Sequence, residues 1–121
     1  MKRFILLLLL CSNLLLSSES IKYGKMILIY VEMKNCPWCI KMDREVFDNS
    51  ANLEKLEKLY HVKRLTKESK EIPTYIKPKY YPSTYILSSD GEKVIDKLPG
   101  YMKAEDYIEY LEILVEVENE E

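Results

Sequence analysis

The chain has 121 residues, of which 47% are apolar and 31% are charged, as is typical of one folded soluble domain. Its 18 Lys and Arg residues against 20 Asp and Glu give a formal net charge of -2, so no basic field favours nucleic acid or an anionic membrane surface. The three cysteines are Cys11, Cys36 and Cys39, an odd number that cannot pair completely within one chain. We therefore expect local chemistry at particular residues rather than an extended charged surface.

The first 20 residues predict a secretory signal peptide. Two basic residues, Lys2 and Arg3, precede a mostly apolar run over residues 4–16, and small polar residues follow it. This is the three-part order of an export signal, and cleavage after Ser18 or Ser20 fits the small residues there. The apolar run is shorter than the about 20 residues that a membrane-spanning helix needs, and a retained anchor is the alternative. We expect a secreted or periplasmic protein that meets the membrane only through an uncleaved signal.

Removal of the signal would divide the cysteines into one and two. Cys11 would leave with the signal; a lipoprotein alternative would use this cysteine, but the residue before it is not small. The remaining domain, residues 21–117 with an acidic tail over 118–121, keeps Cys36 and Cys39. A disulfide between residues three apart closes a ring too small to restrain the unfolded chain, so we expect a reactive pair rather than a structural one.

The cysteine pair follows a predicted buried strand and opens a predicted helix. Residues 25–31 form an apolar run with β-branched side chains, which is typical of a strand covered on both faces. Pro37 suits the first turn of a helix, where its missing N–H is not needed. The four-residue spacing of Met42 and Val46 continues this helix to residue 47. The pair therefore lies where the strand turns into the helix.

Further elements follow toward the C-terminus. The stretch 66–81 carries Pro73 and Pro78 and is predicted to be a loop. The Ser-Ser-Asp-Gly sequence at 88–91 predicts an antiparallel hairpin between the strands on either side of it. The predicted elements are a helix over 50–60, separate from the first or a kinked continuation of it, a strand over 61–65, strands over 81–87 and 93–95, and a final helix over 104–115.

This order of elements resembles the thioredoxin fold, specifically its small exported thioredoxin-like members. The resemblance covers residues 24–116 and rests on the Cys-Pro-Trp-Cys motif at 36–39, a proline-led strand and an Asp-Gly hairpin. The Leu-Pro-Gly-Tyr sequence at 98–101 also looks like the Gly-aromatic junction that precedes the last helix of this family. The resemblance implies an α/β fold with a central mixed β-sheet flanked by helices.

The resemblance also implies roles for individual residues. Cys36 would be the exposed nucleophile and Cys39 would resolve the mixed disulfide, so that a redox-active Cys36–Cys39 disulfide serves in place of a cofactor. The family's cis-proline matches Pro82 rather than Pro73, because only Pro82 leads into a predicted strand and lies nine residues before the hairpin glycine. The residues implied to hold a substrate are Pro37, Trp38, Tyr81 and Pro82.

Two features depart from the family pattern. Many members have a buried carboxylate six residues before the first cysteine, which serves the second cysteine's proton transfer, and Tyr30 stands at this position. Glu32 is the nearest acid, and it shares a face with Tyr30 if the strand alternates regularly. The family's helix before the cis-proline is reduced to the loop over 66–81, where Lys77 and Lys79 contact either solvent or a partner protein. Both departures bear on rate and substrate preference rather than on the fold.

The residues themselves support a reactive Cys36. A thiolate attacks a disulfide, and the free N–H groups at a helix N-terminus lower a cysteine pKa from ~8.5 into the range of about 3.5 to 7.5. Cys39, one helical turn later, is placed to attack the sulfur of Cys36. A zinc site needs four ligands, and besides the two cysteines the mature chain offers only His61, so we expect no metal. The alternative is a binding module in which the two thiolates hold Cu(I).

Together these features predict an exported thiol–disulfide oxidoreductase that reduces or exchanges disulfides in proteins and is a monomer. Its partners would be substrate proteins with thiols or disulfides and a protein that donates or accepts electrons, because the sequence carries no dinucleotide or flavin motif. An alternative is a glutaredoxin-like enzyme that acts on glutathione mixed disulfides. That family uses a Gly-Gly pair after its proline strand, whereas only Gly91 and Gly100 follow Pro82.

Overall fold

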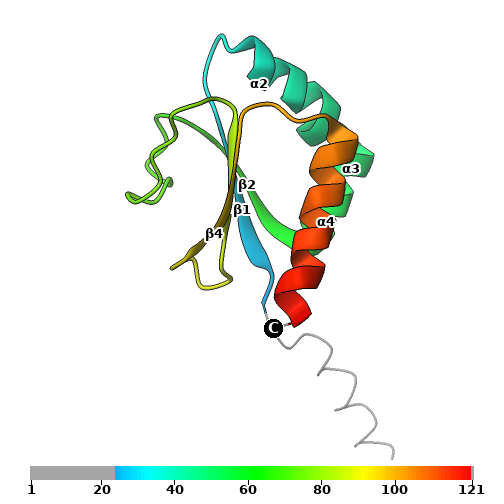
Figure 1. The fold of residues 1–121 in the computed structure, drawn as a ribbon. Coiled ribbons are helices and arrows are strands. Elements are labelled where there is room, and N and C mark those ends of the chain that lie inside the picture. The colour runs from blue at the N-terminus through cyan, green and yellow to red at the C-terminus, as the bar shows by residue number, and fades with distance from the viewer. Residues whose placement is uncertain (1–23, 121) are drawn as a thin grey trace, which may run out of the picture.

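A four-stranded sheet carries all the helices that the structure describes on one of its faces (Figure 1). The computed structural model describes residues 24–120, so the predicted signal peptide, its cleavage site and Cys11 lie outside the described residues. The elements are β1 (Met26–Glu32), α2 (Pro37–Met42), the π-helical turn η2 (Asp43–Phe47), α3 (Ser50–Leu59), β2 (Tyr60–Thr66), β3 (Ser83–Leu87), β4 (Val94–Pro99) and α4 (Ala104–Glu120).

The strands lie in the order β2-β1-β3-β4, with β1 buried in the middle of the sheet. β1 pairs with β2 in parallel and with β3 in antiparallel register, and β3 and β4 form the antiparallel hairpin expected from the turn sequence. A parallel pair needs a crossover connection, and α2, η2 and α3 supply it between β1 and β2. The predicted mixed sheet with helices, and the cysteine motif at a helix start, are confirmed.

The main hydrophobic core lies between the sheet and the helices. It contains side chains from every helix and from three strands, and two tyrosine hydroxyls tie α4 to the sheet. Tyr60 donates a hydrogen bond to the Leu111 carbonyl at 2.6 Å, and the hydroxyls of Thr84 and Tyr107 are 2.8 Å apart. The buried members of this core are Leu28, Tyr30, Met42, Val46, Phe47, Leu56, Tyr60, Ile86, Tyr107, Ile108 and Leu111.

A smaller core lies on the opposite face of the sheet, where the loop between β2 and β3 takes the place of a helix. Residues 67–82 of this loop contain turns but no helix, as the two prolines predict. Ile76 packs fully against the sheet, and Ile72 and Tyr81 cover its margin. The buried members of the smaller core are Ile29, Val31, Leu65, Ile76, Tyr85 and Leu87.

The structure decides one alternative that the sequence left open and moves two boundaries by more than two residues. α3 is separate from the first helix, because the side chain of Asn49 accepts a hydrogen bond from the Asn52 N–H and caps a new N-terminus. β4 continues to Pro99, beyond the three residues expected, because its edge position leaves the missing N–H of proline unneeded. The acidic residues over 118–120, expected as a frayed tail, extend α4 instead, since glutamate is a good helix former.

Within residues 24–120, no helix is both long and apolar enough to cross a membrane.

Candidate active site

Cys36 is the N-cap of α2, and its sulfur receives a backbone hydrogen bond from the helix that follows. Its backbone is extended, Pro37 occupies the first turn, and the Cys39 N–H donates to Cys36 Sγ at 3.2 Å. Just before it, Asn35 has a φ of 58°, a left-handed conformation that asparagine tolerates and that turns the chain from β1 into the helix. The N–H donor and the positive end of the helix both favour a thiolate at Cys36.

The two cysteines form a disulfide with a Cα–Cα distance of 5.2 Å. Cys36 is 5% exposed and Cys39 is 2% exposed, so both residues are buried and Cys36 is the slightly more accessible of the two. A thiol–disulfide exchange requires the attacking sulfur to reach a partner sulfur. The structure therefore brings together both predicted catalytic residues and gives Cys36 the more accessible position.

The segment before β3 forms the second wall of the site. Cys36 Sγ lies 3.6 Å from the carbonyl oxygen of Tyr81, and the Tyr81–Pro82 peptide bond is cis. The Gly100 N–H donates to the Pro82 carbonyl at 2.7 Å and holds this segment against the end of β4. Gly100 has a φ of 83°, a conformation that suits glycine, and it directs the chain toward Tyr101. All four residues expected to hold a substrate thus lie beside the disulfide.

An aromatic groove borders the cysteines. It has a volume of about 540 Å³ and is lined by Trp38, Tyr80, Tyr81, Pro99, Gly100 and Tyr101. Trp38 is 55% exposed and stacks on the Tyr101 ring, with the two centroids 5.3 Å apart. The Lys41 ammonium lies 5.6 Å from the Trp38 ring centroid and 4.9 Å from that of Tyr101, which favours the stack through cation–π attraction. Aromatic rings next to a reactive cysteine can bind a polypeptide backbone and apolar side chains.

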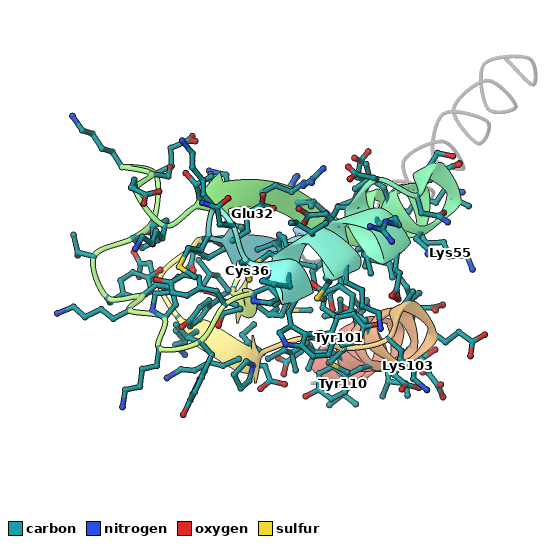
Figure 2. All side chains as sticks on the ribbon, turned by 90° about the horizontal axis from the view of Figure 1, so that it is seen from above. Glu32, Cys36, Lys55, Tyr101, Lys103 and Tyr110 are labelled. Carbon is teal, nitrogen blue, oxygen red and sulfur yellow. A yellow bond between two sulfur atoms is a disulfide. The ribbon has the colours of Figure 1, made fainter. Side chains whose placement is uncertain are left out.

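The hydroxyl group of Tyr101 is also held in place by a hydrogen bond. It donates to both carboxylate oxygens of Glu45, at 2.8 and 2.7 Å, and this hydrogen bond raises the pKa of Tyr101 to about 12. In the view of Figure 2, Cys36 lies between Tyr101 on one side and Glu32 on the other. The groove side of the cysteines is therefore aromatic, while the opposite side carries carboxyl groups.

Those carboxyl groups belong to Glu32 and Asp43. Glu32 Oε2 and Asp43 Oδ1 are both buried, and neither makes a hydrogen bond with another residue of the described chain. An Arg64 nitrogen lies 3.9 Å from Glu32 Oε2 and 3.6 Å from Asp43 Oδ1, close enough for charge attraction but beyond hydrogen-bond distance. Tyr30 completes the cluster: its hydroxyl lies 3.5 Å from the Cys39 carbonyl oxygen.

The environment of this cluster favours protonated groups. Burial, together with the adjacent Asp43, raises the pKa of Glu32 to about 7, although Arg64 acts in the other direction. Burial and Asp43 also raise the pKa of Tyr30, so its phenol stays neutral at physiological pH. A proton shared between Glu32 and Asp43 would satisfy the two oxygens that otherwise have no partner. Regular pairing along β1 places Glu32 on the helix side with Tyr30, as strand alternation predicts.

His61, the remaining candidate ligand in the sequence, is exposed on β2 opposite Ile27 at the start of β1, whereas the cysteines follow the end of β1. Over residues 24–120, no group of three or more His, Cys, Asp or Glu side chains is arranged to hold a metal ion.

Asp43 and Tyr101 were not expected at the site. Asp43 follows Cys39 by four residues, the spacing that places two side chains on the same helix face, so the sequence does contain a sign of it. Tyr101 is recognisable only as part of the junction before the last helix. Its contact with Trp38 joins the end of β4 to the start of α2, two segments far apart in the sequence that no local pattern relates.

Comparisons with known proteins agree with this architecture. A thioredoxin from Thermus thermophilus has a similar solved structure, with a TM-score of 0.59 and 20% identity over 74% of this chain and 73% of that one. The periplasmic thioredoxin SoxS from Paracoccus pantotrophus gives a TM-score of 0.57 and 18% identity over 75% of this chain and 96% of that one. The C-terminal domain of DsbD from Neisseria meningitidis, in the oxidised form, gives a TM-score of 0.54 and 19% identity over 73% of this chain and 78% of that one.

A comparison with curated proteins gives no match to the sequence. A family model, by contrast, described as a thioredoxin-like domain, matches residues 18–114. A thioredoxin-like fold that carries a Cys-x-x-Cys disulfide supports thiol–disulfide oxidoreduction as its general chemistry. With the model matched over most of its length, the chain belongs to the thioredoxin-like family.

Proposed function

We propose that this protein is an exported thiol–disulfide oxidoreductase that reduces or exchanges disulfides in other proteins. The observation that carries the proposal is the position of Cys36, which caps α2, receives the Cys39 N–H on its sulfur and lies against Tyr81, a residue that lines the aromatic groove. Export is supported by the sequence of the first 20 residues, and a periplasmic thioredoxin is among the similar structures.

The reaction begins with both cysteines reduced. The Cys36 thiolate attacks one sulfur of a substrate disulfide, which breaks the substrate S–S bond, forms a mixed disulfide and releases the first substrate thiolate. The Cys39 thiolate then attacks Cys36 Sγ, which forms the Cys36–Cys39 disulfide and releases the second substrate thiolate. Two electrons pass from the protein to the substrate, and a partner protein returns two electrons to the Cys36–Cys39 disulfide before the next cycle. No cofactor besides the cysteine pair takes part, and a monomer suffices.

The second step requires the Cys39 thiol to lose its proton. Asp43 follows Cys39 by one helical turn, and its backbone N–H bonds to the Cys39 carbonyl, so we take the Glu32–Asp43 pair as the acid group that serves this cysteine. A carboxyl whose pKa is about 7 can accept a proton at neutral pH and return it afterwards. We therefore propose that this pair accepts the Cys39 proton. In many other family members a buried carboxylate has this role, at the position where this chain has Tyr30.

Reciprocal cysteine variants test the proposal. The full-length chain carries Cys11→Ser in every sample, so that only the motif cysteines react. Reduced Cys39→Ser, offered an oxidised protein substrate, is expected to accumulate a mixed disulfide through Cys36, whereas Cys36→Ser should accumulate none; peptide mass spectrometry identifies the linkage. Trapping through Cys39 instead would overturn the assignment of roles, and the absence of any exchange in the parent protein would overturn the function.

A further inference from the structure

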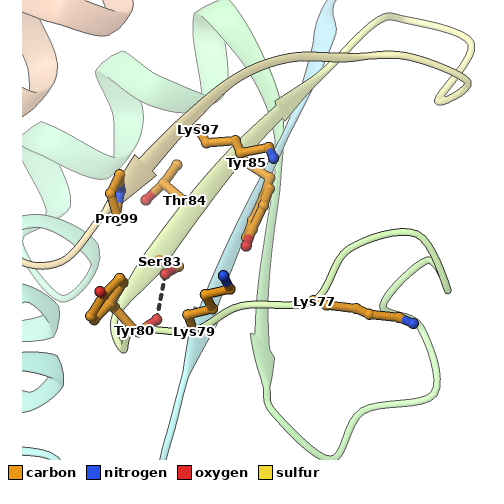
Figure 3. A pocket seen from close by; sticks show the side chains of 8 residues that line it. All are labelled: Lys77, Lys79, Tyr80, Ser83, Thr84, Tyr85, Lys97 and Pro99. Carbon is orange, nitrogen blue, oxygen red and sulfur yellow. Dashed lines mark hydrogen bonds between the residues drawn. The ribbon is translucent and has the colours of Figure 1, made fainter.

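A second hollow adjoins the aromatic groove on the loop face of the sheet (Figure 3). It has a volume of about 260 Å³, and we call it the lysine hollow. Three of its lining residues are lysines, and no carboxyl side chain of the described residues lines either this hollow or the aromatic groove. Its lining residues are Lys77, Lys79, Tyr80, Ser83, Thr84, Tyr85, Lys97 and Pro99.

Two of the lysines flank one tyrosine. Lys97 lies directly opposite Tyr85 in the β3–β4 register, and Figure 3 shows Lys79 approaching Tyr85 from the loop while Lys77 extends away. Within residues 24–120, neither Lys79 nor Lys97 belongs to an ion pair; Asp96, next to Lys97, bonds instead to Tyr110 on α4. Two lysines without an ion pair among the described residues thus border Tyr85, which is itself 8% exposed.

The lysine hollow and the aromatic groove adjoin each other. Tyr80 and Pro99 line both, so a polypeptide that extends from the groove past these two residues reaches the lysine hollow. Lys79 precedes Pro82 by three residues, a span of at most about 10 Å of extended chain. A substrate whose cysteine reaches Cys36 would therefore place a residue about three to four positions away at the lysine hollow.

We propose that the lysine hollow is a subsite for an acidic side chain, so that the preferred substrates are polypeptides with Asp or Glu about three to four residues from the reacting cysteine. The proposal rests on the function proposed above. A carboxylate between Lys79 and Lys97 would gain two charge-assisted contacts and a phenol donor from Tyr85. The ammonium groups are exposed, so the effect on the rate of encounter is moderate and depends on salt.

The test compares peptides that differ only in one pair of residues. Each peptide carries one cysteine as a mixed disulfide with the same small thiol, and two positions three and four residues away hold Glu-Glu, Gln-Gln or Lys-Lys, placed before or after the cysteine in separate peptides. The fluorescence of Trp38, the one tryptophan of the chain, follows oxidation of the reduced full-length protein by stopped flow. One of the two positions, before or after the cysteine, should bring the glutamates to the lysine hollow. At low salt, we expect the Glu-Glu peptide of that kind to react about fivefold faster than its Gln-Gln counterpart, as two exposed ion pairs imply.

A matched pair of double variants isolates the subsite. Lys79→Gln with Lys97→Gln should remove the preference for Glu-Glu while leaving the rate with Gln-Gln unchanged. Lys55→Gln with Lys63→Gln removes the same charge from α3 and from β2, the opposite edge of the sheet, and should keep the preference.

The outcomes separate the two proposals. Equal rates for Glu-Glu and Gln-Gln in the parent protein, or a preference that survives the Lys79 and Lys97 changes, would overturn the subsite while the exchange itself is intact. No reaction with any peptide or with a small disulfide would overturn the proposed function instead. Loss of the preference in the Lys55 and Lys63 control would also overturn the subsite, because it would assign the effect to overall charge.

Discussion

The two faces of the sheet are covered in different ways, and the active site lies at the edge where they meet. One face is covered by α2, η2, α3 and α4, whose side chains form a continuous core with the strands. The other is covered by the loop over residues 67–82, from which Ile76 is the one buried member of the smaller core. Figure 1 shows the helices and this loop on opposite sides of the strands.

The two faces therefore have different roles at the site: one holds the cysteines in place and the other supplies residues that would contact a substrate. The helix face fixes the cysteines, because α2 and η2 bury Met42, Val46 and Phe47 against the sheet. The loop face supplies Tyr80 and Tyr81, which line the groove where a substrate would lie. We therefore expect changes on the helix face to act mainly on stability and changes on the loop face to act mainly on the reaction with substrates.

The largest effect is expected for Phe47→Ala on the helix face. The Phe47 ring lies 4.1 Å from the Tyr30 ring and 6.1 Å from the Tyr107 ring, between centroids, and it is 2% exposed. Removal of a buried phenyl group leaves a cavity and should lower the free energy of unfolding by about 4 kcal/mol, measured by urea denaturation. Among molecules that remain folded, the exchange rate should change little.

Two milder variants support this measurement. Phe47→Leu keeps most of the volume and should cost less than about 1.5 kcal/mol, so it remains folded if the alanine variant does not. Tyr107→Phe removes only the hydrogen bond to Thr84 and should cost about 1 kcal/mol. A loss below 2 kcal/mol for Phe47→Ala would contradict the division between the faces.

Ile76→Ala on the loop face should have a smaller effect on stability and a larger one on substrate reaction. The expected loss is about 2 kcal/mol, at the low end for a buried isoleucine, because a loop can move into the space that a packed helix cannot fill. Ile76 anchors the segment that carries Tyr80 and Tyr81, so its loss should slow exchange with peptides more than exchange with a small disulfide.

The comparison of those two substrates decides the outcome. A small disulfide needs only the cysteines, whereas a peptide also needs the groove walls. An equal slowing of both substrates in Ile76→Ala would mean that the loop positions Cys36 itself, through the Tyr81 carbonyl, rather than the substrate.

Much of the fold is predictable from local patterns. The apolar run of β1, the proline at the start of α2 and the Asp-Gly turn each depend on neighbouring residues, and the structure places them as expected. The extension of β4 to Pro99 is not predictable, because Asp96 and Lys97 have low strand propensity and are held by pairing with β3.

The site was only partly predictable, for a related reason. The cysteine motif and Pro82 are conspicuous in the sequence, and the chain brings them within contact of each other. The residues that shape their surroundings come from distant segments: Tyr101 follows β4, and Arg64 lies on β2 opposite Tyr30. Such neighbours depend on contacts between segments that are distant in the sequence, which a local pattern does not specify.

The smallest stability effect, and the most specific for the chemistry, is expected for Glu32→Gln. Burial and Asp43 raise the pKa of Glu32 from 4.5 to about 7, so the folded protein binds this proton more tightly than the unfolded chain. The protonated Glu32 carboxyl therefore adds its full contribution to the free energy of unfolding below pH 4.5, and this contribution is lost as the pH rises through about 7. Because both carboxyls are partly screened by solvent, the loss should be on the order of 1 kcal/mol. Urea denaturation between pH 4.5 and 8 should show this slope in the parent protein and not in Glu32→Gln.

Asp48→Asn is the control, because Asp48 bonds to the same Arg64 but is exposed, and this variant should keep the slope. Asp43→Asn should reduce the slope without abolishing it, since burial alone still raises the pKa of Glu32 when the neighbouring carboxyl is gone. If the pair accepts the Cys39 proton, both variants should also slow the second step of exchange, the release of the mixed disulfide, while the first attack by Cys36 keeps its rate. A flat stability profile with an unchanged second step would leave the pair as a structural feature of the helix face and would assign the proton transfer elsewhere.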